Sequence, residues 1–197
     1  MRRWRALFLI TAVMGPAARV AGQDLIVNGH FNTDINGWTL AGVGAQLWDP
    51  LDWQGNPASG SIRITNTDPV GNQGTGSGQC IPLTPSGTYE VGTHVRFPSG
   101  QAALGFGAAA VGWFDNTTCA GTPLATVNAP AVASTTTNTW VESFMSGLTA
   151  PAGTVAVAAG VGVLKIGAGG SLAGLFDRVR FGPTGTTPVN ADGFTVE

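Results

Sequence analysis

The feature of this sequence that most constrains its fold is an alternation of apolar and polar residues with a period of two. Residues 88–97 are the clearest example, because one face is mainly apolar and the other is polar. The first face carries Tyr89, Val91, Thr93, Val95 and Phe97, and the second carries Thr88, Glu90, His94 and Arg96. This pattern predicts a half-buried antiparallel strand. No segment from residue 24 onward shows a sustained helical period, which argues against a helical bundle.

The alternating segments are separated by turn-forming residues. The chain has 30 Gly and 12 Pro among 197 residues, enough to punctuate many short strands. We predict strands at residues 24–27, 46–48, 61–65, 78–83, 88–97, 103–114, 139–148, 154–166 and 172–181. The glycine-rich stretch at residues 71–78 is predicted to be a loop. The predicted fold class is all-β, a two-sheet antiparallel β-sandwich of the jelly-roll type.

Residues 1–22 have the features of a secretory signal peptide. Arg2, Arg3 and Arg5 precede an apolar run of about nine residues, and small residues follow it up to Gly22. The run is too short to cross a bilayer, which takes about 20 residues. We therefore predict a secreted protein, extracellular or periplasmic, without membrane insertion. The predicted β-sandwich domain covers residues 23–182, and residues 183–197 are predicted to form a flexible tail.

The predicted mature chain is acidic, with five basic side chains against eleven acidic ones once residues 1–22 are removed. So few basic groups cannot neutralise a row of phosphates, which disfavours nucleic acid and anionic membranes as partners. A neutral polymer is the expected partner. We expect a monomer that binds a polysaccharide or another glycan.

Cys80 and Cys119 are the only cysteines. In an oxidising compartment they favour one intramolecular disulfide, with two free thiols or an intermolecular bridge as the alternatives. The bridge would close a loop of about 40 residues, which stabilises a fold by roughly 4 kcal/mol in the chain-entropy model. Its predicted role is structural.

Two segments at opposite ends of the predicted domain resemble a known family. Leu-Ile-Val-Asn-Gly-His-Phe-Asn begins at Leu25 and is followed by Gly37 and Trp38, and Leu-Phe-Asp-Arg-Val-Arg-Phe begins at Leu175. Ser-Gly-Ser-Ile-Arg-Ile and Tyr-Glu-Val lie between them, at residues 59–64 and 89–91. This order resembles the CenC-type carbohydrate-binding modules, galactose-binding-like jelly rolls that include families 4, 9 and 22. The resemblance covers residues 24–182 and implies a glycan-binding module.

The closing segment contains an acidic residue in an apolar pattern. Strict alternation places Asp177 on one face with Leu175 and Val179, where a carboxylate is unfavourable unless it is paired, hydrogen-bonded or bound to a metal. In the family that the sequence resembles, this Asp and an acidic residue at the position of Asn32 help to hold a structural calcium ion. The resemblance therefore implies a calcium site at Asn32 and Asp177, with a neutral amide oxygen in place of one carboxylate. The alternative is that Asp177 accepts backbone N–H groups or pairs with an arginine.

Exposed tryptophans are the natural candidates for glycan binding, because sugar rings stack their C–H faces on aromatic planes. Trp53 lies in a segment of turn-forming and polar residues, and Trp48 ends a predicted strand. The predicted ligand-binding residues are Trp53, Trp48, Asp52 and Gln54. The alternative for Trp53 is a lid over one end of the sandwich. Trp38 and Trp140 are predicted to lie in the core.

No motif for enzymatic catalysis is recognisable. The sequence has no nucleophile elbow, no His-Glu-x-x-His motif and no phosphate-binding loop. We therefore predict no catalytic residues and a protein that is not an enzyme. The predicted function is binding of neutral glycan chains by aromatic stacking, and the alternative is a secreted structural or protein-interaction domain. A small hydrolase built on a carboxylate pair such as Asp49 and Asp52 is a third hypothesis.

Overall fold

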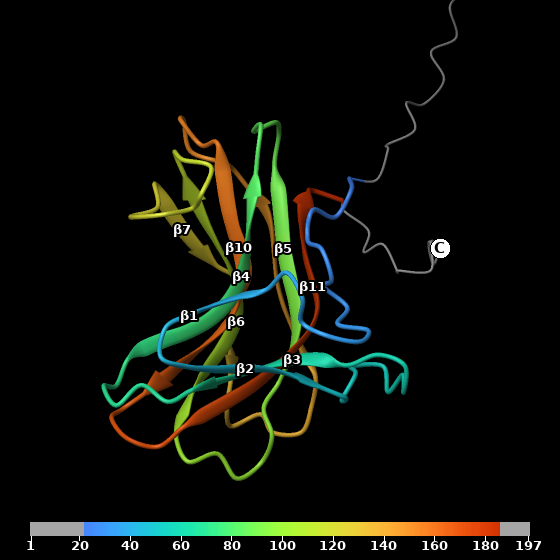
Figure 1. Cartoon of the computed structure of the whole chain (residues 1–197), viewed down its shortest axis with the longest axis vertical. Coiled ribbons are helices and arrows are strands. Elements are labelled where there is room, and N and C mark those ends of the chain that lie inside the picture. The colour runs from blue at the N-terminus through green and yellow to red at the C-terminus, as the bar shows by residue number, and fades with distance from the viewer. Residues whose placement is uncertain (1–21, 186–197) are drawn as a thin grey trace, which may run out of the picture.

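Eleven strands build two antiparallel sheets that pack face to face in the computed structural model, which describes residues 22–185 (Figure 1). The six-stranded sheet has the order β1-β4-β10-β6-β7, with β8 paired to β6, and the five-stranded sheet has the order β2-β3-β11-β5-β9. The strands are β1 Thr39–Ala41, β2 Gly44–Asp49, β3 Ser61–Asn66, β4 Gln73–Pro82, β5 Tyr89–Arg96, β6 Leu104–Phe114, β7 Ala125–Asn128, β8 Val132–Ala133, β9 Val141–Leu148, β10 Ala156–Ile166 and β11 Leu172–Pro183. The predicted fold class is confirmed.

The hydrophobic core lies between the two sheets. The inward face of β5 is buried as predicted, with Tyr89, Val91 and the following Phe97 in the core, but Glu90 on the predicted polar face is buried as well. Aromatic rings fill one region of it: Tyr89 stacks on Phe181 at 5.5 Å between ring centroids, and Trp113 meets both rings edge-on. Trp38 is also buried, as predicted. Trp140 is only half-buried, so its predicted place in the core is wrong.

The strand boundaries differ from the prediction at three places. Residues 24–27 are not a strand, although the N–H of Leu25 donates to the carbonyl of Phe181 in β11, beyond the residues of β11 that pair with β3. The predicted glycine-rich loop at residues 71–78 is mostly part of β4, because neighbouring strands supply its backbone hydrogen bonds. The short strands β1, β7 and β8 were not predicted, since two to four residues are too few to show a period.

The structure describes little of the predicted signal peptide and only the first residues of the predicted tail. The predicted signal peptide, residues 1–22, lies outside the described residues except for Gly22. Pro183 ends β11, and Thr184 and Gly185 donate backbone N–H groups to Thr88 and Glu90, so the first three residues of the predicted tail are held by β5. Residues 186–197 lie outside the described residues. Within residues 22–185, no helix has the length and hydropathy that a membrane span needs.

The outer faces of the two sheets differ in charge. In the strands, every charged residue except Lys165 belongs to the five-stranded sheet. Lys165 points inward from β10 and is completely buried. The outward positions of the six-stranded sheet therefore carry no charge, and Gly and Ala occupy many of them.

Candidate ligand-binding groove

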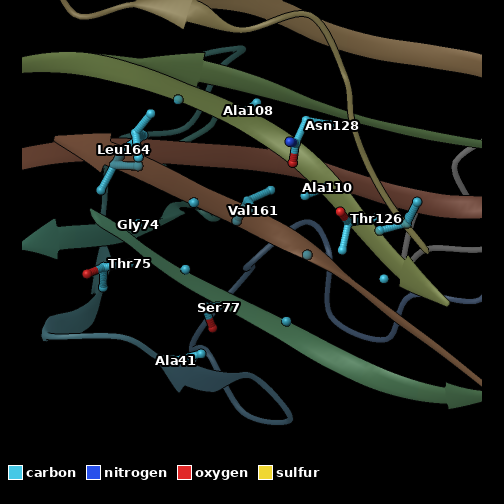
Figure 2. A pocket seen from close by; sticks show the side chains of 18 of the residues that line it. Ala41, Gly74, Thr75, Ser77, Ala108, Ala110, Thr126, Asn128, Val161 and Leu164 are labelled. Atoms are coloured by element: carbon cyan, nitrogen blue, oxygen red, sulfur yellow. The ribbon is translucent and has the colours of Figure 1, made fainter. Parts of the chain in front are cut away.

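A groove with a volume of about 540 Å³ lies on the outer face of the six-stranded sheet (Figure 2). Its floor consists of alternate residues of β4, β10 and β6, which point away from the core. Most of these residues are Gly or Ala: Gly74, Gly76, Gly78, Phe106, Ala108, Ala110, Gly112, Ala158, Gly160, Gly162 and Leu164. Among residues 22–185, none of those that line the groove is charged.

Close approach of β4 and β10 requires glycine at four positions of the floor, residues 76, 78, 160 and 162. Gly76 lies opposite Gly162 and Gly78 lies opposite Gly160 in the register of β4 and β10. A Cβ atom on Gly160 would lie 2.2 Å from the carbonyl oxygen of Ser77, too close for any side chain. The floor is therefore largely backbone, so a ligand can lie directly against the sheet.

One edge of the groove is polar and another is apolar. Asn128 and Thr126 project from β7 at the polar edge, beside Ala110 (Figure 2). At the far end of β6 and β10, four large side chains remain exposed, and we call them the apolar patch. They are Leu104, Phe106, Leu164 and Ile166, with Phe106 37 % exposed. Phe106 is the only aromatic residue that lines the groove.

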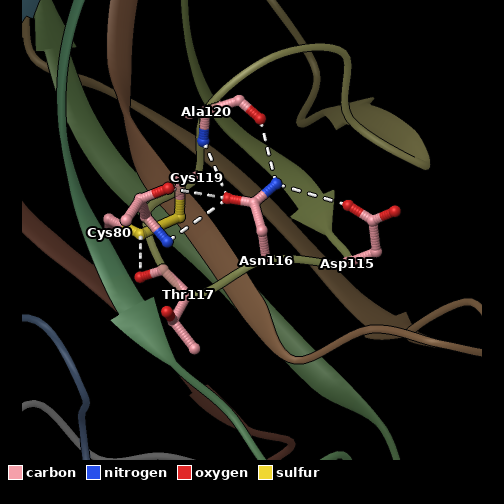
Figure 3. The surroundings of a disulfide bond; sticks show 7 residues. Cys80, Asp115, Asn116, Thr117, Cys119 and Ala120 are labelled. Carbon is pink, nitrogen blue, oxygen red and sulfur yellow. Dashed lines mark hydrogen bonds between the residues drawn. A yellow bond between two sulfur atoms is a disulfide. The ribbon is translucent and has the colours of Figure 1, made fainter.

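The predicted disulfide is present between Cys80 and Cys119, and it lies at the other end of the groove. Cys80 follows Gly78 in the outward row of β4 and pairs with Ala158 of β10. Cys119 belongs to the loop 115–124, which leaves the end of β6 (Figure 3). Because β10 lies between β6 and β4, this loop crosses β10 on the outer face of the sheet.

Asn116 fixes the shape of that loop. Its side-chain oxygen accepts N–H groups from Thr118 and Ala120, and its amide nitrogen donates to the carbonyl of Ala120 at 2.9 Å (Figure 3). The carbonyl oxygen of Thr117 lies 3.5 Å from the sulfur of Cys80. The loop is thus tied both within itself and to β4.

The predicted ligand-binding residues lie elsewhere, on the side of the five-stranded sheet. The half-buried indole of Trp53 stacks on the His94 ring at a centroid distance of 3.9 Å, and the guanidinium of Arg178 lies 5.4 Å from the indole. Burial lowers the pKa of His94. Trp53 thus packs on the outer face of the five-stranded sheet.

The other three predicted residues have contacts of their own. Trp48 is 38 % exposed, and its indole N–H donates to the carbonyl of Phe31 at 2.7 Å. Asp52 is buried and accepts the N–H groups of Gln54 and Asn56, which shapes the loop after β2. The side chain of Gln54 is exposed. Ligand binding by these residues stays a prediction.

Asp177 does not face the core as strict alternation predicted. It lies opposite His94 in the register and therefore shares the outer face of the five-stranded sheet. A β-bulge between Asp177 and Arg180, with Arg178 at a φ of 51°, shifts the alternation by one residue. The loop with Trp53 covers Asp177, which is only 1 % exposed.

The carboxylate of Asp177 accepts the backbone N–H groups of Trp53 at 3.0 Å and of Arg178 at 2.6 Å. Burial raises the pKa of Asp177 to about 7, these N–H groups oppose the rise, and the neighbouring carboxyl of Asp52 adds to it. The carboxyl group that lies beside Asp177 is therefore that of Asp52.

Asn32 is half-buried, and its side-chain oxygen accepts the hydroxyl of Ser59 at 3.2 Å. Between residues 22 and 185, no three His, Cys, Asp or Glu side chains gather as a metal site would require. The oxygens of Asp52 and Asp177 are nevertheless the donors that suit calcium, and a cation would relieve the repulsion between them. Calcium binding stays a prediction.

The groove itself was not found from the sequence. Its signal was present as small residues at alternate positions, at 74, 76 and 78 in β4 and at 158, 160 and 162 in β10. A strand with Gly at every second position resembles a loop in composition, so the stretch 71–78 was assigned to a loop.

Solved structures share the fold of this chain. A xylan-binding domain of carbohydrate-binding module family 22 superposes with a TM-score of 0.59 at 17 % identity, over 81 % of this chain and 94 % of that domain. The C-terminal family 22 module of Clostridium thermocellum Xyn10B gives 0.54 at 18 % identity, over 82 % and 98 %. The module TmCBM61, solved with β-1,4-galactotriose, gives 0.51 at 16 % identity, over 81 % and 97 %.

Two longer proteins match in part only. The chain spans 21 % of a bacteriophage CBA120 tailspike protein 4 chain and 30 % of a two-module xylanase chain from Clostridium thermocellum. No family model matches the sequence, and no curated protein does. The resemblance to galactose-binding-like carbohydrate-binding modules is thus confirmed as a shared jelly-roll fold.

Proposed function

We propose that this protein is a secreted, non-catalytic module that binds a neutral glycan chain in the groove of the six-stranded sheet. The observation that carries the proposal is the absence of charge from every residue lining a groove of about 540 Å³. A charged ligand would leave water without finding an ionic partner there, which is unfavourable. A neutral chain has no charge to transfer from water.

The groove offers both kinds of contact that a sugar chain uses. The floor of Gly and Ala leaves flat backbone surface for the C–H faces of the rings, and the ring of Phe106 adds an aromatic contact at one end. Asn128 and Thr126 supply hydrogen-bonding groups for hydroxyls along one edge. Because no Trp or Tyr lines the groove, the proposed binding depends less on aromatic stacking than the sequence predicted.

The structural neighbours support this function by what they bind. One is described as a xylan-binding domain, another was solved with β-1,4-galactotriose, and in a third the amino acids of a cleft are described as having a role in ligand binding. Glycan binding on the same fold is the analogy that we carry to this chain.

Two further observations support the remaining parts of the proposal. In the part of the chain that the structure describes, no Asp, Glu or His lines the groove, whereas glycoside hydrolysis needs a pair of carboxylates beside the sugar. The Cys80–Cys119 disulfide supports an oxidising location, as the predicted signal peptide does.

We also propose that calcium binds beside Asp177 and Asp52 and stabilises the loop that carries Trp53.

The test is retention of the protein on insoluble polysaccharides and on a soluble panel that includes xylan and β-1,4-galactan. Ala110 lies on the groove floor, so Ala110→Phe fills the groove and is expected to abolish retention. The control is Ala45→Phe, which adds the same ring at an exposed position of the other sheet and is expected to retain binding. If Trp53→Ala lost binding and Ala110→Phe kept it, the ligand would bind at the tryptophan loop instead of the groove.

A second candidate function has one observation in its favour. The apolar patch exposes Leu104, Phe106, Leu164 and Ile166 together, and contiguous exposed apolar residues are typical of protein-interaction surfaces. A folded protein that no glycan retains would favour this structural or protein-interaction function.

A further inference from the structure

The groove continues along its strands into the apolar patch. Along β10, the lining residues from Ala158 to Leu164 extend over about 20 Å at the usual rise per residue, similar to the width of about 19 Å from β1 to β7. Beyond Leu164, the exposed side chain of Ile166 continues the outward row to about 26 Å. A linear ligand that lies on the floor and also contacts the apolar patch therefore runs along β10 and β6.

The two ends of this direction differ. At one end the apolar patch leaves Ile166 and Leu104 exposed, so nothing among the described residues stops a chain from continuing past them. At the other end, Ala156 and Phe114 occupy outward positions and yet are 0 % and 6 % exposed. The loop 115–124 crosses β10 at this end of the sheet to reach Cys80, which pairs with Ala158.

The loop is held in place strongly enough to act as a wall. The disulfide ties it to β4, and the amide of Asn116 satisfies backbone groups on both sides of the turn. Pro123 and the ring of Phe114 lie over Gly112, where the open floor ends. A rigid wall excludes a chain without being displaced by it.

We propose that the disulfide-linked loop closes one end of the groove, so that the groove receives the end of a linear glycan chain and excludes chain interiors. This inference rests on the proposed function of glycan binding. It gives Cys80 and Cys119 a positioning role for the ligand in addition to their effect on stability. The ligand class is a linear neutral glycan with an accessible terminus.

The experiment uses xylan and β-1,4-galactan, each as intact polymer and as an equal mass shortened by mild hydrolysis. At saturation, the moles of wild-type protein bound per gram of glycan are expected to rise in proportion to the number of chain ends. A tenfold shortening of the chains should therefore raise this capacity about tenfold. For the Cys80→Ser/Cys119→Ser variant, the loop is released, and the intact and shortened samples are expected to bind within about twofold of each other.

A matched control separates this role from stability. Leu148→Ala removes a buried side chain in β9 of the other sheet and leaves the disulfide intact. It is expected to lower the melting temperature and to keep the preference for chain ends. All binding is measured well below the melting temperatures, with folding checked by near-ultraviolet circular dichroism.

Each outcome decides the inference. Equal wild-type capacity for intact and shortened glycan would overturn it and leave glycan binding in place. A preference that persists in the Ser/Ser variant would show that the disulfide does not form the wall. If the wild-type protein bound neither glycan in either form, the proposed function would be wrong and this inference with it.

Discussion

Gly78 of β4 and Gly160 of β10 lie directly opposite each other in the floor of the groove, and no side chain separates their backbones from solvent. A Cβ atom on Gly160 would lie 2.6 Å from the Cα of Gly78. Gly160→Ala is therefore expected to lower the free energy of unfolding by about 1–3 kcal/mol, measured by urea denaturation. The control is Gly74→Ala, whose Cβ meets nothing closer than 3.9 Å and which is expected to change stability by less than about 0.5 kcal/mol. Equal effects of the two substitutions would contradict the close approach of the strands.

Trp53→Ala is expected to destabilise the protein without abolishing glycan retention. The indole covers the ring of His94 and lies beside Arg178, so its loss removes packing worth about 1–3 kcal/mol. Chemical denaturation and the polysaccharide assay are measured on the same samples. Loss of retention at unchanged stability would instead assign the indole to the ligand.

The carboxyl of Asp177 makes stability depend on pH. Its pKa is about 7 in the folded protein against an ordinary value of 3.8, so the folded state holds a proton that the unfolded state has released. Stability is therefore lost as the pH rises from about 4 through 7. His30 and His94 act in the opposite direction, because their lowered pKa values make stability fall as the pH drops below about 6.5.

The isosteric variant Asp177→Asn isolates the carboxyl, because both histidines remain. The decrease in melting temperature between pH 5 and pH 8 is expected to be smaller in Asp177→Asn than in the wild-type protein. Asp24, whose pKa burial raises to about 6, contributes equally to both proteins. Identical pH profiles would show that Asp177 is not protonated preferentially in the folded state.

Calcium at millimolar concentration is expected to raise the melting temperature at pH 8, and a chelator is expected to reverse the increase. The oxygens of Asp52 and Asp177 are the proposed ligands, so Asp177→Asn is expected to remove the response. Asn32→Glu adds a carboxylate at the predicted position and tests whether residue 32 reaches the ion. A wild-type protein that melts at the same temperature with calcium and with chelator would refute this proposal.

Lys165→Met is expected to destabilise the fold by about 2–3 kcal/mol. The buried ammonium of Lys165 donates to the carbonyls of Asp68, Gly169 and Gly170, and methionine leaves these three oxygens without a donor. The control Arg63→Met breaks an exposed ion pair with Asp49 at 3.8 Å and is expected to change stability by less than about 1 kcal/mol. Both values come from urea denaturation monitored by tryptophan fluorescence.

The sequence predicts the fold well where alternate residues of a strand face the core, as between Tyr89 and Phe97. The alternation predicts the wrong face for Asp177 because the bulge at Arg178 shifts the pattern by one residue. The residue types at the bulge do not indicate that a bulge is present. Only the two cysteines of the candidate site could be paired from the sequence, since they had no other partner in the chain.

The groove was missed for a physical reason. A strand is recognised in a sequence by alternating apolar and polar side chains. Strands in which every second residue is Gly or Ala show almost no such alternation. The position of Trp53 was equally hidden, because it depends on how the loop after β2 folds back to Asp177 and His94. Such contacts join residues far apart in the chain, and local patterns carry no information about them.

The unequal charge of the two outer faces has a consequence for how copies of this protein arrange themselves. When the groove holds the end of a neutral chain, the charged side of the sandwich faces away from that chain. Bound copies would then turn Arg63, Arg96 and Glu142 toward the solvent. A polysaccharide with its chain ends occupied would in this way acquire a charged exterior that it lacks by itself.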